Sequence, residues 1–309
     1  MKPVLVAGEL NVDLILTGMD SPPVFGGEIL ASGLCQTPGS SSMICAMGLA
    51  RLGAPVRFVG RVGGDERGRY CTEALGRAGI DASGVIIDPW LETGLTIALS
   101  SARDRALVTY PGAIAALKAE DVNDASLQDA SHLHVSSYFL QRRLREGLAH
   151  LIARARLAGL SVSLDPGYDP EGLWQAGIRD VLPLVDIFLP NEVEALAITG
   201  AADVETALRE LAALCPTVVV KTGAKGCIGI DEDGEIHRVS AFTVKAMDTT
   251  GAGDSFDAGF LHAWLNSRPL DECMRWGAAC GALSTRALGG TPGQADEAEV
   301  RSMLAGVTA

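Results

Sequence analysis

Short apolar runs alternate with segments of helical character along most of the chain, and this alternation restricts the possible folds more than any other feature. Apolar runs of up to about eight residues predict buried strands. The expected strands are residues 3–7, 56–60, 133–135, 160–164, 187–189 and 217–221, with a hairpin at 227–239. The expected helices are 43–52, 66–78, 140–157, 193–198, 204–214, 253–265, 270–287 and 295–304. Strands joined through helices form parallel sheets, so the sequence predicts an α/β fold.

Two segments do not fit this alternation. Residues 14–37 are rich in Gly and Pro and contain only one possible extended stretch, at 28–36. Residues 93–100 and 106–110 are rich in β-branched residues and flank a polar turn, which is typical of a pair of strands. We therefore expect these segments to form a small sheet of their own.

Composition and charge limit the possible partners. Of the 309 residues, 48% are apolar and 20% charged, as in ordinary globular proteins. The 25 Lys and Arg against 38 Asp and Glu give a net charge of −13, which repels nucleic acids and anionic membranes. No stretch approaches the roughly 18 apolar residues of a spanning helix. The expected partner is therefore a small molecule, with neither nucleic acid nor membrane involved.

The cysteines and histidines indicate a compartment and exclude one class of site. The seven cysteines are scattered and include no Cys-x-x-Cys pair, so we expect reduced thiols and a cytoplasmic protein. The five histidines include no His-Glu-x-x-His pattern, and we do not expect a zinc enzyme.

The segment Asp248-Thr-Thr-Gly-Ala-Gly-Asp254 stands just before an expected helix and suggests chemistry. Small residues at a helix N-terminus leave backbone N–H groups bare, and these groups with the helix dipole favour an anion such as a phosphoryl group. A carboxylate in the first helical turn, Asp254, can accept a proton from an attacking hydroxyl. The same residues also fit a plain glycine turn with Asp254 as a helix cap, and the sequence alone leaves both interpretations open.

With this segment the chain resembles the ribokinase-like (PfkB) family of carbohydrate and nucleoside kinases. Further matches follow in order along the chain: Asn11-x-Asp13, Val62-Gly-Gly-Asp-x-x-Gly68, Thr93-Gly94, Gly112-Ala113, Asn191-Glu-x-Glu194 and Lys221-Thr-Gly-x-x-Gly226. The resemblance implies a three-layer αβα sandwich with a small β-sheet lid. It further implies one kinase domain over residues 1–309, with lid segments at about 14–37 and 93–112.

The resemblance also implies ATP and Mg²⁺ as cofactors, possible use of K⁺, and a role for each matching residue. Asp254 is the expected base, with Gly251, Ala252 and Gly253 as the anion hole. The expected sugar-binding residues are Asn11 and Asp13. The expected ATP-binding residues are Asn191, Thr222, Gly223, Gly226, Gly251 and Gly253. Glu194 is expected to hold Mg²⁺ through water, and Asp248 with the Thr250 carbonyl to hold a monovalent cation.

The chain departs from the family pattern beside the sugar site. The family usually has an Asn that reaches the sugar, and Ile44 takes that position in the segment Pro38-Gly-Ser-Ser-Ser-Met-Ile44. Gly39, Ser40 and Ser42 are therefore candidate substrate-binding residues, with the serines as small replacement donors, although the serines also fit a helix N-cap. Arg105 is a candidate clamp for the carboxylate of a sugar acid. Asp165, which follows an expected strand, can add a carboxylate near the phosphates or stand in a structural turn.

Taken together, these features predict an ATP-dependent kinase that phosphorylates a hydroxyl of a small sugar or sugar acid of the ribose, fructose or 2-keto-3-deoxygluconate type. One alternative is a nucleoside kinase, with Tyr110 and Phe139 stacking on a base. Another is a non-catalytic sugar- or nucleotide-binding regulator on the same fold. In relatives the lid often forms a dimer interface, which makes a homodimer through the lid sheet possible.

Overall fold

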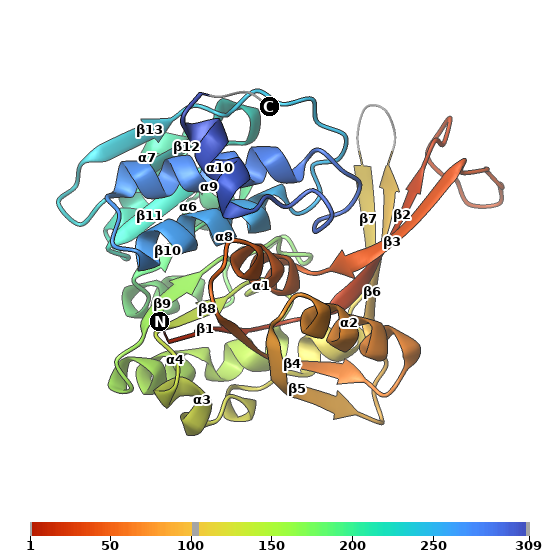
Figure 1. Ribbon diagram of the computed structural model, residues 1–309, viewed down its shortest axis with the longest axis horizontal. Helices are drawn as coiled ribbons and strands as arrows, with labels where there is room; N and C mark the ends of the chain where they lie inside the picture. Colours follow the sequence, from red (N-terminus) through yellow and green to blue (C-terminus); the bar gives the residue numbers. More distant parts are fainter. Residues whose placement is uncertain (1, 101–104, 307–309) are drawn as a thin grey trace.

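A nine-stranded sheet forms the centre of the protein, in a computed structural model that describes residues 2–100 and 105–306 (Figure 1). Its strands run in the order β13-β12-β11-β10-β9-β8-β1-β4-β5. They are β1 (Val4–Ala7), β4 (Val56–Gly63), β5 (Asp81–Asp88), β8 (His132–Val135), β9 (Ser161–Leu164), β10 (Ile187–Phe188), β11 (Thr217–Lys221), β12 (Cys227–Ile230) and β13 (Ile236–Val239). The strand β12 is antiparallel to both of its neighbours, β11 and β13. The other neighbouring pairs of these strands are parallel.

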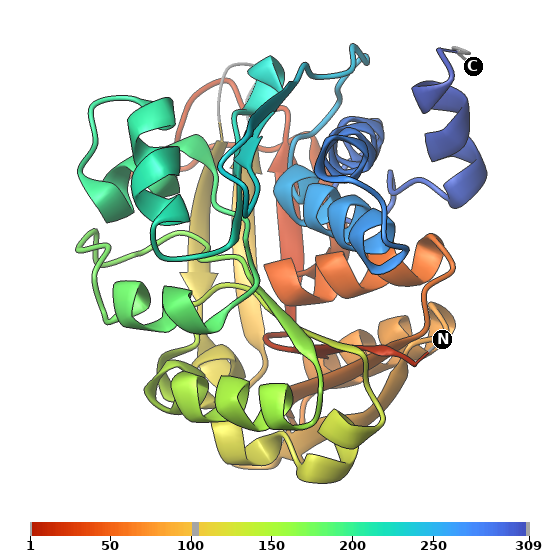
Figure 2. The same cartoon turned by 90° about the vertical axis from the view of Figure 1, so that its left-hand side faces the viewer.

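Helices cover both faces of this sheet (Figure 2). They are α1 (Ser41–Arg51), α2 (Glu66–Arg77), α3 (Asp124–Gln128), α4 (Arg142–Leu157), α5 (Ile178–Val181), α6 (Glu192–Thr199), α7 (Val204–Ala212), α8 (Ala252–Leu265), α9 (Leu270–Ser284) and α10 (Glu297–Leu304). Alternate residues of β1 enter opposite cores: Leu5 belongs to the core that contains residues of α4 and α7, whereas Val4 and Val6 belong to the core that contains residues of α1, α8 and α9. The predicted three-layer αβα sandwich is therefore confirmed, and the apolar strands are continuous because both faces are buried. None of the described helices is both long and apolar enough to cross a membrane.

A second sheet of four strands projects from one side of the sandwich (Figure 1). Its order is β3-β2-β6-β7, with β2 (Asn11–Thr17), β3 (Gly33–Gly39), β6 (Gly94–Ser100) and β7 (Arg105–Tyr110). The predicted small sheet is thus present, but residues 14–37 were wrongly expected to hold a single extended stretch at 28–36. They contribute to two strands, because β2 starts at Asn11 and β3 starts only at Gly33. The strand β5 was also missed.

The glycine motifs near Asp65 join the two sheets. The Asp65 carboxylate caps α2 by accepting the Gly68 N–H at 2.8 Å, and it also accepts the Thr93 N–H at 2.8 Å and the Thr93 hydroxyl at 2.6 Å. The Gly63 N–H donates to that same hydroxyl at 2.9 Å. Thr93 directly precedes β6, so this set of hydrogen bonds fixes the place where the small sheet leaves the main sheet.

Two glycines of α2 allow a matched test of this packing. A Cβ at Gly68 would lie 2.3 Å from the Gly63 carbonyl oxygen, whereas a Cβ at Gly76 would meet nothing within 4 Å. We expect Gly68→Ala to destabilise the protein by about 1–3 kcal/mol through overpacking. Gly76→Ala should instead stabilise it by about 0.5–1 kcal/mol, because alanine favours a helix over glycine. Thermal unfolding of both variants checks this, and equal shifts would contradict the close contact.

Candidate active site

The helix α8 begins at a tight glycine turn near the carboxyl ends of β9 and β11. Gly251, the N-cap residue, has a φ of 71°, in the left-handed region. A Cβ there would lie 2.6 Å from the Gly290 Cα and 3.1 Å from Ile44. Only glycine fits such a position without strain. The turn therefore places the backbone N–H groups of Gly251, Ala252 and Gly253 at a helix N-terminus, a geometry that binds anions, and of these the Ala252 N–H also donates to the Thr249 carbonyl at 3.3 Å.

Asp254 lies in the first turn of α8 and is half-buried. Burial, followed by the negative charge of Asp165, raises the pKa of Asp254 to about 6, while Lys221 and a hydrogen bond with Ser41 act in the opposite direction. A carboxylate with this pKa is ionised above neutral pH and still basic enough to accept a proton.

Lys221, Asp165 and Asp257 form a buried ion cluster next to Asp254. The Lys221 Nζ lies 2.6 Å from Asp165 Oδ2 and 3.0 Å from Asp257 Oδ1. Burial alone would raise the pKa of Asp165, but the Lys221 charge lowers it below its ordinary value. Burial raises the pKa of Asp257 well above its ordinary value. Asp165, Asp254 and Asp257 bring one oxygen each within 4.8 Å of one another. The sequence did not pair Lys221 with these acids, because the lysine ends β11, Asp165 follows β9, and Asp254 and Asp257 belong to α8.

Glu194 and Asn191 form a capping box at the start of α6. The Glu194 N–H donates to Asn191 Oδ1 at 2.9 Å, and the Asn191 N–H donates to Glu194 Oε2 at 2.8 Å. Burial, then the charge of Asp165, raises the pKa of Glu194 to about 8. A buried carboxylate beside further carboxylates is a place where Mg²⁺ would be favoured, since hard oxygen atoms are its preferred ligands. Glu194 therefore fits the predicted role at the Mg²⁺ site.

Asp248 shapes the loop before the glycine turn. Its buried carboxylate accepts the Thr250 N–H at 3.0 Å, the Thr250 hydroxyl at 2.8 Å and the Gly289 N–H at 2.8 Å. Carboxylate and carbonyl oxygens are the ligand types of hard cations, so Asp248 and Thr250 fit the predicted monovalent-cation site in chemistry.

Asn11, Asp13 and Gly39 meet on the face of the small sheet that carries Thr96. Asn11 pairs with Gly39 across β2 and β3, and a Cβ on Gly39 would lie 2.1 Å from Asp13 Oδ1 and 2.5 Å from Asn11 Oδ1. Asn11 Nδ2 donates to the Thr96 hydroxyl at 2.7 Å. Asn11 Oδ1 is buried and accepts no hydrogen bond within the described part of the chain. An unsatisfied buried acceptor of this kind suits a ligand hydroxyl.

Two serines at the start of α1, Ser40 and Ser42, bond to Glu9, a buried residue that the sequence analysis missed. The Ser40 hydroxyl donates to the Glu9 carbonyl at 2.6 Å and accepts the Met43 N–H, so the N-cap interpretation is confirmed for Ser40. The Ser42 hydroxyl donates to the Glu9 carboxylate. These bonds give no support to substrate contacts by Ser40 and Ser42. Ile44 is buried against Gly251 and Gly290 and closes the back of the glycine turn.

A cavity of about 460 Å³ opens beside the glycine turn. Its lining includes Lys221, Gly223, Gly226, Ala252 and Gly253. Its walls are formed mainly by apolar side chains, among them Phe242, Val244, Phe256, Ala278 and Ala282. An apolar pocket beside a helix N-terminus suits a nucleotide, with the base among the apolar residues and the phosphates at the helix N-terminus.

Several remaining candidates lie outside this cavity. Thr222 lines a separate surface hollow with Glu192 and Lys225. Phe139 is buried in edge-to-face contact with Tyr138 and Trp174, so its ring is not presented to a base. Arg105 begins β7, but its side chain lies outside the described part of the structure.

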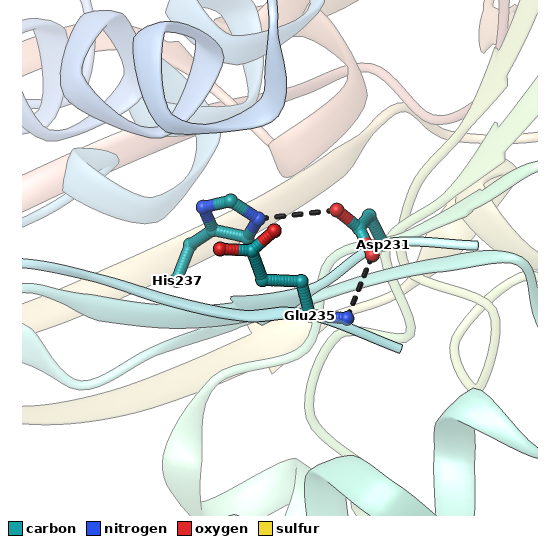
Figure 3. A group of neighbouring side chains, drawn as sticks. All are labelled: Asp231, Glu235 and His237. Carbon is teal, nitrogen blue, oxygen red and sulfur yellow. Dashed lines mark hydrogen bonds and ion pairs between the residues drawn. The ribbon is translucent and has the colours of Figure 1, made fainter. Parts of the chain in front are cut away.

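A further group of possible ligands lies on the β12–β13 hairpin (Figure 3). The His237 Nε2 lies 3.1 Å from Asp231 Oδ2, and Asp231 Oδ1 accepts the N–H groups of Asp233 and Glu235. The sequence analysis did not single out these residues. The bonds to Asp233 and Glu235 account for Asp231 as a residue that shapes the hairpin turn.

The chain is similar to known carbohydrate kinases in sequence and in fold. The model of the pfkB family of carbohydrate kinases matches residues 1–297. A ribokinase from Haemophilus influenzae is 31% identical over 296 residues, 92% of each chain. A 5-dehydro-2-deoxygluconokinase from Geobacillus thermodenitrificans is 30% identical over 79% of this chain and 77% of its own. A Vibrio cholerae fructokinase solved with fructose, ADP and potassium is 28% identical, with a TM-score of 0.81 over 98% of both chains. The chain belongs to the pfkB family of carbohydrate kinases.

Proposed function

We propose that this protein is an ATP-dependent kinase that transfers the γ-phosphoryl group of ATP to a hydroxyl of a small sugar or sugar acid. The observation that carries the proposal is that Asp254 lies in the first turn of α8, directly after Ala252 and Gly253, which line a nucleotide-sized cavity. Such an arrangement supplies a proton acceptor and an anion hole at one point, which are the groups that phosphoryl transfer needs.

The proposed reaction is a direct transfer. The acceptor hydroxyl oxygen bonds to the γ-phosphorus, while the bond from that phosphorus to the bridging oxygen breaks and ADP leaves with the electron pair. The hydroxyl proton passes to the Asp254 carboxylate. The amides at Gly251–Gly253 stabilise charge on the phosphoryl oxygens, and Asn11 with Asp13 orients the acceptor. Catalysis in this scheme comes from positioning and charge stabilisation.

The ions have proposed places around this centre. Mg²⁺, bound with the phosphates, supplies charge neutralisation, and Glu194 would hold it through water. Asp248 and the Thr250 carbonyl would hold a monovalent cation next to the anion hole. Asn191 and Thr222, which do not line the cavity, stay proposed contacts of the nucleotide.

The proposed acceptor class follows from the relatives and from the polar face of the small sheet. The similar proteins are a ribokinase, a fructokinase and a 5-dehydro-2-deoxygluconokinase, which are kinases of small sugars or sugar acids. Asn11 and Asp13 have side chains that can bind hydroxyls, and any side chain at position 39 would collide with both of them. Arg105 remains the proposed contact for a carboxylate. Ser40 and Ser42 are proposed to act on this site only through Glu9.

The experiment that tests this function is acceptor-dependent ADP release from ATP and Mg²⁺, with and without K⁺. The panel contains ribose, fructose, 2-keto-3-deoxygluconate, sugar phosphates and nucleosides. Turnover with a sugar or sugar acid supports the proposal, and preference for a nucleoside would replace it with a nucleoside kinase. ATP binding without turnover on any acceptor would favour a non-catalytic regulator.

Asp254→Asn should remove most of kcat and leave the affinity for ATP near that of the wild type. The reason is that the amide anion hole survives, whereas the proton acceptor is lost. Because the pKa of Asp254 is about 6, wild-type activity should rise with pH through about 6 as the carboxylate ionises. Steady-state kinetics between pH 5 and pH 8 check both points. Turnover retained in the variant would show that Asp254 is not the base.

Asp13→Ala should raise the KM for the acceptor more than the KM for ATP. The Asp13 carboxylate lies with Asn11 on the proposed acceptor face, away from the nucleotide cavity. Steady-state kinetics with each substrate varied in turn check this expectation. Equal rises in both KM values would show that Asp13 is not part of the acceptor site.

The proposed assembly is a homodimer through the outer face of the small sheet. Residues two apart on a strand share a face, so Leu34 and Val108 lie on the face opposite Asn11 and Asp13. Leu34 and Val108 are 70% and 60% exposed. Val108→Glu should convert a dimer to a monomer in sedimentation experiments, because a charge would be buried in the interface. A wild-type monomer would contradict this assembly.

The proposed compartment is the cytoplasm. All seven cysteines are free thiols, and six of them are buried. Free thiols persist in reducing compartments, where ATP is also available. We further propose that residues 1–309 form one kinase domain, since both hydrophobic cores pack on the same central sheet.

A further inference from the structure

Lys221 is a buried lysine whose charge the proposed reaction scheme does not yet use. It is the last residue of β11, and its side chain is only 10% exposed. A lysine is rarely buried in this way unless it is paired. The ammonium donates to Asp165 at 2.6 Å and to both oxygens of Asp257 at 3.0 and 3.2 Å. The three bonds hold the ammonium between two carboxylates, and its positive charge acts on any further anion that comes close.

The ammonium lies at the anion hole. The Lys221 Nζ is 3.6 Å from the position that a Cβ on Gly253 would take, and Lys221 and Gly253 line the same cavity. A phosphoryl group held by the Gly251–Gly253 amides would therefore have the ammonium close to its oxygens. At this distance an opposite charge in a water-poor site interacts strongly.

The centre needs a positive charge of its own. Several acids surround Asp254, and the charged and polar groups that act on it come from different elements: Glu9, Ser41, Cys45, Asp165, Glu194, Lys221 and Asp257. Lys221 is the cation that opposes the raised pKa values of both Asp254 and Glu194. A triphosphate entering such an acidic centre, in a chain of net charge −13, requires a local cation.

We propose that the Lys221 ammonium contacts the transferring phosphoryl group, and that Asp165 and Asp257 are positioning residues that hold the ammonium there. The inference rests on the proposed kinase function and adds to it. As the γ-phosphorus moves from the bridging oxygen of ADP to the acceptor oxygen, Lys221 stabilises the charge on the equatorial oxygens. The proton still passes to Asp254, so Lys221 neither gains nor loses one.

The main test compares Lys221→Met with Lys221→Arg and with the control Lys118→Met, which alters an exposed lysine away from the cavity. Lys221→Met should lower kcat by about 100- to 1000-fold, as the loss of one group at an anion hole does. Lys221→Arg keeps the charge and should recover part of kcat. Lys118→Met should match the wild type. A kcat for Lys221→Met within about threefold of wild type would overturn the proposal.

A binding experiment separates this role from a structural one. The probes are ADP with Mg²⁺, and ADP with Mg²⁺ and aluminium fluoride, which imitates a phosphoryl group in transfer. Lys221→Met should weaken the aluminium fluoride complex by at least about tenfold more than the ADP complex. Equal weakening of both would show that Lys221 only supports the fold, and would overturn the inference. Because this readout needs no acceptor, it can fail or succeed independently of the panel that tests the proposed function.

A double variant keeps the proposal testable if Lys221→Met does not fold. Removing the lysine alone leaves buried carboxylates without their cation, which is destabilising. Asp165→Asn with Lys221→Met removes an opposite pair of charges and should recover thermal stability. Its kcat should still be reduced by about 100-fold or more. A folded double variant with kcat near that of the wild type would contradict the proposal.

Discussion

The ion cluster of Lys221, Asp165 and Asp257 is the interaction on which the centre of this structure depends. It joins the ends of β9 and β11 to α8, three elements that are distant in the sequence. Charges buried in this way cost desolvation energy and are weak evidence for stability. Their place at the helix N-terminus that forms the anion hole gives a functional reason for keeping them there.

The same cluster sets the protonation of the surrounding acids. Asp165 stays ionised beside the ammonium, whereas burial raises the pKa of Asp257 well above its ordinary value. Asp254 lies between these extremes, with a pKa of about 6. Neighbouring carboxylates with different pKa values can take different roles. Asp254 therefore suits a proton acceptor, while the two other carboxylates hold the lysine.

The elements with continuous apolar sequence could be predicted from the sequence, and so could the glycine turn before α8. β1 and β11 are buried on both faces, which gives the apolar runs that indicate strands. β2 was missed, because Asp13 interrupts its apolar pattern and the Gly- and Pro-rich segment follows at once. This polar pattern has a functional cause, because Asn11 and Asp13 face the proposed acceptor site. The strand therefore lacks the continuous apolar residues by which a strand is predicted from sequence.

The unpredicted parts of the site depend on contacts across long sequence separations. The Glu9 carboxylate accepts a hydrogen bond from the Ser42 hydroxyl, and the Lys221 ammonium donates one to Asp165, 56 residues away in the sequence. No spacing rule within one segment reveals such pairs. Ile44 shows the same limit: the sequence marked it as a departure from the family pattern, but only the structure shows that it packs behind Gly251 and Gly290.

The central claim is that one centre holds the phosphoryl group between a nucleotide cavity and an acceptor face. The most direct measurement is a crystal structure with ADP, Mg²⁺, aluminium fluoride and the acceptor found in the panel. We expect the fluoride group on the Gly251–Gly253 amides, with Lys221 in contact and the acceptor hydroxyl between Asp254 and the metal fluoride. A fluoride group bound away from those amides, or an acceptor away from Asn11 and Asp13, would contradict the account.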